Sequence, residues 1–189
     1  MTTASQLVTA EELLAMPNDQ PCELIAGGIV MMTPAGYEHG IIAVRIIALL
    51  RSHAAKNKLG SVSSAEAGFL ISRDPDTVRV PDVAFVRRDR QPTAPKGFFP
   101  GAPDLAVEVI SPTDLPALQQ AGRLADVDIK TQAWLDAGTA MVWVVWPDPR
   151  TVIVHRPGQP PRILHDQDAI TGEEVLPGFQ CAVAEFFGD

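Results

Sequence analysis

The stretch from Asp104 to Ser111, DLAVEVIS, constrains the fold of this chain more than any other. A β-strand alternates its side chains between two faces, so Glu108 would lie in the middle of an otherwise apolar, buried run. An unpaired buried carboxylate is costly, and Glu108 therefore needs a partner. A metal ion, a lysine in a structural ion pair, or a bound proton would each serve. A role as metal ligand or catalytic acid would need further polar residues elsewhere in the chain.

Size and composition indicate one globular domain. The 189 residues are 46% hydrophobic, which suffices for a sizeable core, and we expect a single domain over residues 1–189. No apolar run reaches the length of a membrane span, and the N-terminus lacks the charged and apolar blocks of a signal peptide. We therefore expect a cytoplasmic protein with no membrane partner, in which Cys22 and Cys181 are reduced thiols. Without a CxxC pair, the two cysteines also argue against a zinc site.

The charge is unevenly distributed. A net charge of −8 argues against loose electrostatic attachment to nucleic acid. Residues 41–100, however, contain ten of the 15 Lys and Arg residues but only five of the 23 Asp and Glu residues. This clustering predicts either a locally basic face or ordinary solvated surface charge, and the sequence leaves both open.

The hydrophobic pattern predicts an α/β protein with a central mixed sheet, helices on both sides and an early hairpin. The turn signals divide the chain into these expected elements, in order: a helix capped by Thr9 and ended by Pro17, a hairpin over 22–32 around Gly27-Gly28, a helix over 38–57, strands over 61–71 and 78–86, a loop over 87–103, the 104–111 strand, a helix before Gly138, and antiparallel strands over 140–146 and 151–156. Pro81, inside the 78–86 run, indicates a bulge, an edge or a strand start, because proline cannot donate to the ladder.

Asp82, Glu108 and Lys130 fall on three successive elements of this pattern. Two carboxylates on adjacent core strands repel each other unless a cation lies between them. Mg²⁺ suits such a pair, since it takes one or two protein carboxylates and keeps several waters. A lysine near bound water can orient it or stabilise the charge that develops in phosphodiester cleavage. These parts suffice for metal-dependent hydrolysis of a nucleic-acid backbone, although many α/β proteins contain residues of these types.

Pro81-Asp82 followed by Glu108 in an apolar strand resembles the PD-(D/E)xK nuclease superfamily. More narrowly, the chain is similar to a large bacterial family of restriction-endonuclease-like proteins. The matching blocks follow one another along nearly the whole chain: ELI at 23–25 with Gly27, TP at 33–34 with HG at 39–40, PDVAFV at 81–86, PDLAVEVISP at 103–112, Lys130 with Leu135 and AG at 137–138, VWVV at 142–145, and LPGF at 176–179.

The resemblance implies a restriction-endonuclease-like fold and a Mg²⁺-dependent endonuclease acting on DNA, with Mn²⁺ as a substitute cation. Asp82 and Glu108 would bind the metal, and the backbone carbonyl of Val109 would be a further ligand. Lys130 would be the catalytic lysine, relocated to the helix from its usual place two residues after the glutamate. Glu23 would be the extra acidic residue found near some of these metals. By analogy with other nucleases of this fold, the resemblance also implies a homodimer.

Several positions depart from the family pattern. Ala26 and Gly28 stand where the family usually has acidic residues, and Asp148 is displaced from its usual place. These departures favour an alternative function, a catalytically inactive module that binds nucleic acid or protein. A glycosidase using Glu108 and Asp82 is a third candidate, but the single tyrosine and the lack of an aromatic platform disfavour it. For His39, a role as helix cap or core residue is favoured over a catalytic one.

Overall fold

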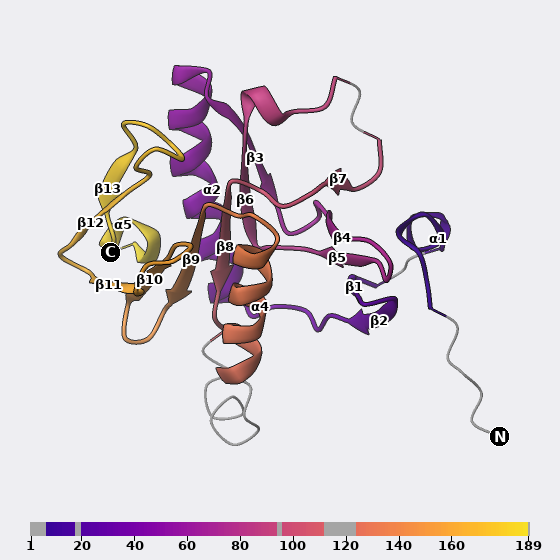
Figure 1. The fold of residues 1–189 in the computed structure, drawn as a ribbon. Coiled ribbons are helices and arrows are strands. Elements are labelled where there is room, and N and C mark those ends of the chain that lie inside the picture. Colours follow the sequence, from indigo (N-terminus) through magenta and orange to yellow (C-terminus); the bar gives the residue numbers. More distant parts are fainter. Residues whose placement is uncertain (1–6, 18–19, 94–95, 112–123, 189) are drawn as a thin grey trace.

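A six-stranded mixed sheet forms the centre of the protein (Figure 1). We describe the fold from a computed structural model that places residues 7–17, 20–93, 96–111 and 124–188. The strand order of the central sheet is β11 (Arg162–His165), β10 (Thr151–His155), β9 (Met141–Trp146), β8 (Leu105–Val109), β6 (Val83–Arg87) and β3 (Gly60–Ser64). Strands β8 and β9 are parallel and the other neighbours are antiparallel, which confirms the mixed sheet expected from the sequence.

Helices cover both faces of this sheet. On one face, α2 (Tyr37–Asn57) and the short α5 (Ala184–Phe187) pack against the odd-numbered residues of β8, such as Val107. On the other face, α4 (Leu124–Asp136) places Trp134 against Ala106 and its neighbours. The alternation along β8 is therefore the one expected from the sequence, and it directs Glu108 toward the α4 side.

A second, five-stranded sheet extends to one side of the central sheet (Figure 1). Its strand order is β2 (Gly28–Met31), β1 (Cys22–Ile25), β5 (Thr77–Arg79), β4 (Phe69–Ser72) and β7 (Phe99–Pro100), and α1 (Ala10–Ala15) packs beside it. The expected hairpin is present, but its turn is Ala26-Gly27, one residue earlier than predicted. Both turn residues have positive φ, 48° and 78°, as a two-residue hairpin turn of type I′ requires.

Two strands predicted as continuous are each divided between the two sheets. The 61–71 run forms β3 and β4, and the 78–86 run forms β5 and β6. The second break lies at Val80-Pro81-Asp82, where proline cannot donate to a sheet ladder. The prediction of one continuous strand over 78–86 was wrong, because an apolar run does not reveal to which sheet each of its parts belongs. The break places Asp82 at the start of β6, where the chain passes from one sheet to the other.

The remaining elements of the described residues are η1 (Arg88–Arg90) and a two-stranded sheet of β12 (Ala169–Thr171) and β13 (Gln180–Ala182). Cys22 on β1 and Cys181 on β13 belong to different sheets, in agreement with the expectation of two reduced thiols. Among the described residues, no helix is both long enough and apolar enough to cross a membrane.

Candidate functional site

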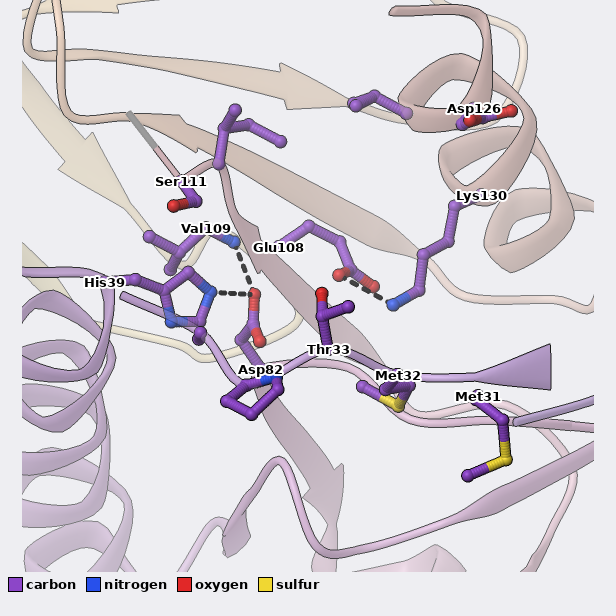
Figure 2. Close-up of a pocket in the computed structure, with 14 residues that line it drawn as sticks. Met31, Met32, Thr33, His39, Asp82, Glu108, Val109, Ser111, Asp126 and Lys130 are labelled. Carbon is purple, nitrogen blue, oxygen red and sulfur yellow. Dashed lines mark hydrogen bonds and ion pairs between the residues drawn. The ribbon is translucent and has the colours of Figure 1, made fainter. Parts of the chain in front are cut away.

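A pocket of about 400 Å³ opens where the β2–α2 connection, the start of β6, the end of β8 and the first turns of α4 meet. Asp82, Glu108 and Lys130 all line it, so the structure brings together the three residues singled out in the sequence. Figure 2 shows Asp82 beside His39 on one side, and Glu108 beside Lys130 on the other. The remaining walls are largely apolar: Met31, Met32, Pro34, Ala35, Val109, Ile110 and Val127.

Asp82 is anchored to the neighbouring strand β8. Its Oδ2 atom accepts a hydrogen bond of 2.7 Å from the backbone N–H of Val109. The antiparallel ladder between β6 and β8 ends at the pair Val83 and Val107, because the chain turns away at Pro81. The Asp82 carboxylate thus accepts the hydrogen bond of a backbone N–H that a longer β6 strand would have paired. This bond fixes the carboxylate at the pocket.

Glu108 is buried, with 7% of its surface exposed, and both of its carboxylate oxygens are bonded. The indole Nε1 of Trp134 donates to Oε1 at 2.8 Å, and the Nζ of Lys130 lies 2.9 Å from Oε2. Burial raises the pKa of Glu108 to about 7, with Lys130 opposing this shift and Asp82 adding to it. Lys130 and Trp134 are four residues apart on α4, so one face of the helix presents both donors to Glu108.

Lys130 is held by three acceptors. Besides Glu108, its Nζ atom lies 3.3 Å from Oε1 of Glu23 and donates to the backbone carbonyl of Val80 at 3.0 Å. Burial by itself would lower the pKa of Lys130, but the charges of Glu108, Glu23 and Asp82 outweigh it and raise the pKa. The side chain is therefore an ammonium group over the physiological pH range. It can donate hydrogen bonds and stabilise negative charge, but it cannot act as a base.

Glu23 lies behind Lys130, outside the residues that line the pocket. It is buried on β1, where Oε2 pairs with Arg79 at 2.9 Å and Oε1 accepts the backbone N–H of Val80 at 2.9 Å. Its link to the site is the contact with Lys130. A catalytic role for Glu23 stays a prediction. The Glu23 carboxylate is directed toward Lys130.

His39, in the first turn of α2, belongs to the site although the sequence favoured a cap or core role. Its Nε2 lies 3.1 Å from Oδ2 of Asp82, and its side chain is 11% exposed. Burial lowers the pKa of His39, but the hydrogen bond and charge of Asp82, together with Glu108 and the Val109 carbonyl, produce a net rise. Asp126, in the first turn of α4, also lines the pocket and was not predicted. A histidine soon after a Thr-Pro turn was the only sequence signal for His39.

The pocket suits a hard divalent cation that keeps most of its water. The carboxylates of Asp82, Glu108 and Asp126 line it, together with the ammonium group of Lys130. A carboxylate offers about four lone-pair positions, so the hydrogen bonds to Glu108 leave acceptor sites available. Within the described ranges, no group of three or more His, Cys, Asp or Glu side chains is arranged to hold a metal. This donor set fits Mg²⁺ or Mn²⁺ with solvent ligands better than a closed zinc site.

None of the ten basic residues clustered over residues 41–100 lines the pocket, and four of them form ion pairs with other described residues. Arg87 is at the opposite end of β6 from Asp82, and it pairs with Asp89 at 2.5 Å. Other members of the cluster pair in the same way: Arg73 with Glu11 and Asp76, Arg90 with Asp104, and Arg79 with Glu23. Part of the positive charge in this region is therefore compensated within the protein.

Comparisons with known proteins place the chain in a family. The family model described as "Uma2: Putative restriction endonuclease" matches residues 10–184. None of the curated protein sequences matches. Among solved structures, a "putative nuclease belonging to DUF820" from Anabaena variabilis superimposes with a TM-score of 0.78 at 21% sequence identity, covering 95% of this chain and 97% of that one. This likeness confirms the predicted fold. Because the family match spans nearly the whole sequence, the chain belongs to the Uma2 family of proteins described as putative restriction endonucleases.

Proposed function

We propose that the protein is a divalent-cation-dependent endonuclease that hydrolyses phosphodiester bonds of DNA. The observation that carries this proposal is the meeting of Asp82, Glu108 and Lys130 in one pocket, with the Lys130 ammonium 2.9 Å from Glu108. Membership of a family described as putative restriction endonucleases supports the same reaction class.

Each residue has a role that follows from its contacts. Asp82 and Glu108 would hold Mg²⁺ or Mn²⁺, with the Val109 carbonyl as a further ligand, and the cation would activate water and stabilise phosphate charge. Lys130, whose raised pKa keeps it protonated, would stabilise the negative charge that develops on the phosphate.

Calorimetric titration of the wild-type protein with Mn²⁺ and Mg²⁺ tests this function. We expect saturable binding of both cations, and nicking of supercoiled plasmid only when one of them is present. Asp148→Asn is a suitable control, because Asp148 is exposed in the β9–β10 turn and lies outside the pocket. No binding by the wild type, even with DNA present, would overturn the proposal.

Cation binding is expected to strengthen between about pH 6 and about pH 8. Burial raises the pKa of Glu108 to about 7, and a carboxylate must lose its proton before it binds a metal. Below that pKa, protons compete with the cation, so the affinity should fall roughly tenfold per pH unit; above it, the affinity should level off. Titrations in two buffers of different ionisation enthalpy would also show proton release. Affinity and proton release that do not vary with pH would contradict this account.

Replacing His39 with leucine is expected to weaken Mn²⁺ binding about 10- to 100-fold, the usual cost of removing a group that orients a metal ligand. The variant removes one of the two donors that hold Oδ2 of Asp82. His39→Gln, whose amide can reach the position of Nε2, can still donate to Asp82 and should lose less affinity. Calorimetry on both folded variants measures the difference, and a His39→Leu protein with wild-type affinity would exclude this role.

One observation favours the second candidate function, a binding module without activity. Glu108 is already paired with Lys130 and Trp134, so the protein alone satisfies this buried carboxylate. A module of this kind would bind no cation and would tolerate Glu108→Gln without loss of nucleic-acid or protein binding. The cation titration described above therefore separates the two functions.

DNA as the substrate, a homodimer and a cytoplasmic location remain proposals. The homodimer gains support from β2, an edge strand of the five-stranded sheet whose residues Ile29, Val30 and Met31 are exposed. An exposed apolar edge strand is a common site of pairing with another chain.

A further inference from the structure

The position of the Lys130 ammonium group requires an explanation, because a lysine on a helix is not oriented by the helix alone. Its stem has four carbons and many rotamers. In nucleases of the simple motif the lysine would stand on the strand itself, at the position of Ile110, whereas here it reaches the pocket from α4. Groups outside α4 must therefore hold it in place.

The second sheet supplies these groups. Glu23 on β1 and Val80 after β5 both contact Nζ of Lys130, at 3.3 Å and 3.0 Å. Oε1 of Glu23 also accepts the N–H of Val80, so the two acceptors are tied to each other. Together with Glu108 they surround the ammonium group from three directions, which matches its three donors.

Arg79 completes this arrangement from the neighbouring strand β5. Its guanidinium lies 2.9 Å from Oε2 of Glu23, and both side chains are less than 10% exposed. Arg79 and Lys130 balance the charges of Glu23 and Glu108, so the buried cluster holds two cations and two anions. Arg79 thereby fixes the Glu23 carboxylate, so that its other oxygen stays directed at Lys130.

We propose that Glu23 and Arg79 are positioning residues that hold Lys130 against Glu108 at the edge of the pocket. Glu23 then acts on the lysine and not on the cation. The catalytic consequence of this inference rests on the proposed nuclease function, but the positioning itself does not.

The motion of the Lys130 side chain tests the positioning directly. The chain has four lysines, so a ¹⁵N spectrum of the ammonium groups is simple, and exposed Lys56 and Lys58 are internal references for free rotation. In the wild type, the order parameter of the Lys130 Cε–Nζ bond should be near the value of a rigid backbone, about 0.85. In Glu23→Gln and Arg79→Met it should fall below about 0.6, the range of flexible groups.

Two further variants control this measurement. Arg73→Met removes an exposed arginine that pairs with Glu11 and Asp76, away from the lysine, and should leave Lys130 rigid. Arg79→Lys keeps a cation beside Glu23 and should restore rigidity. If Arg79→Met fails to fold, the Glu23→Gln variant provides the test, because glutamine has nearly the same shape as glutamate. A Lys130 that stays rigid in Glu23→Gln, or that is mobile in the wild type, would overturn the proposal.

Cation affinity separates positioning from ligation. Glu23→Gln should bind Mn²⁺ as the wild type does, while its rate of plasmid nicking falls about 10- to 100-fold. Weaker Mn²⁺ binding would instead make Glu23 a ligand and contradict our assignment. If the wild type neither binds Mn²⁺ nor nicks DNA, the nuclease function fails, but the order parameters still decide whether Glu23 and Arg79 hold Lys130.

Discussion

Lys130→Met is expected to slow phosphodiester cleavage about 10²- to 10³-fold, the usual cost of removing one group that stabilises the transition state. Methionine keeps an unbranched stem that can occupy the same space, but it removes the ammonium group 2.9 Å from Glu108. Because Lys130 contacts a carboxylate that would bind the cation, without being a ligand itself, Mn²⁺ binding should persist. Initial rates of plasmid nicking at saturating Mn²⁺, together with calorimetry, measure the two effects separately.

Lys56→Met is the matched control, since Lys56 is exposed near the end of α2 and should be replaceable without effect. Equal nicking rates for Lys130→Met and the wild type would remove Lys130 from the mechanism. Loss of Mn²⁺ binding in Lys130→Met would show that the lysine maintains the structure of the pocket, and the catalytic role would then lack support.

The second large effect is expected for Glu108→Gln, which should weaken Mn²⁺ binding by at least about 100-fold, more than the loss of a group that only orients a ligand. Glutamine keeps the size of the side chain and an oxygen that can accept the Trp134 indole N–H, so the local packing should survive. It removes the negative charge that a divalent cation requires. Calorimetric titration of the folded variant measures the loss.

Circular dichroism and the Asp148→Asn control distinguish a lost ligand from a lost fold. A folded Glu108→Gln protein that binds Mn²⁺ like the wild type would mean that Glu108 serves only its internal partners. That result would favour the non-catalytic binding module.

The central part of the fold could be predicted because its pattern is local. An apolar run with one carboxylate identified β8, and the helical spacing of Ile42, Ile46 and Leu50 identified α2, whose inner face these residues form. The division of the strands could not be predicted in the same way. An apolar run that continues through Pro81 has the same sequence pattern whether its residues belong to one sheet or to two.

Three ionisable residues of the candidate site were singled out from the sequence, whereas His39, Asp126 and the supporting groups were not. Asp82, Glu108 and Lys130 were placed together by resemblance, and the structure brings them into one pocket. Trp134 is both fully buried and a donor to Glu108, a contact that the sequence did not predict. Such contacts depend on how α4 lies over the sheet, which spacing along the chain does not specify.

The same reason explains the contacts of His39 and Arg79. His39 meets Asp82 across 43 positions of sequence, and Arg79 meets Glu23 across 56. Pairs at such separations depend on how the strands and α2 pack, which the local sequence pattern does not specify. A buried arginine in an apolar strand was a signal that a buried acid would be its partner, but it did not identify Glu23.

Nicking of supercoiled plasmid by the wild-type protein, with Glu108→Gln purified in parallel, tests the central claim most directly. Our account predicts nicking by the wild type with Mg²⁺ or Mn²⁺, no nicking in EDTA, and a rate for Glu108→Gln reduced to the background. A wild type that leaves the plasmid intact under all of these conditions, or a Glu108→Gln protein that nicks at the wild-type rate, would contradict it.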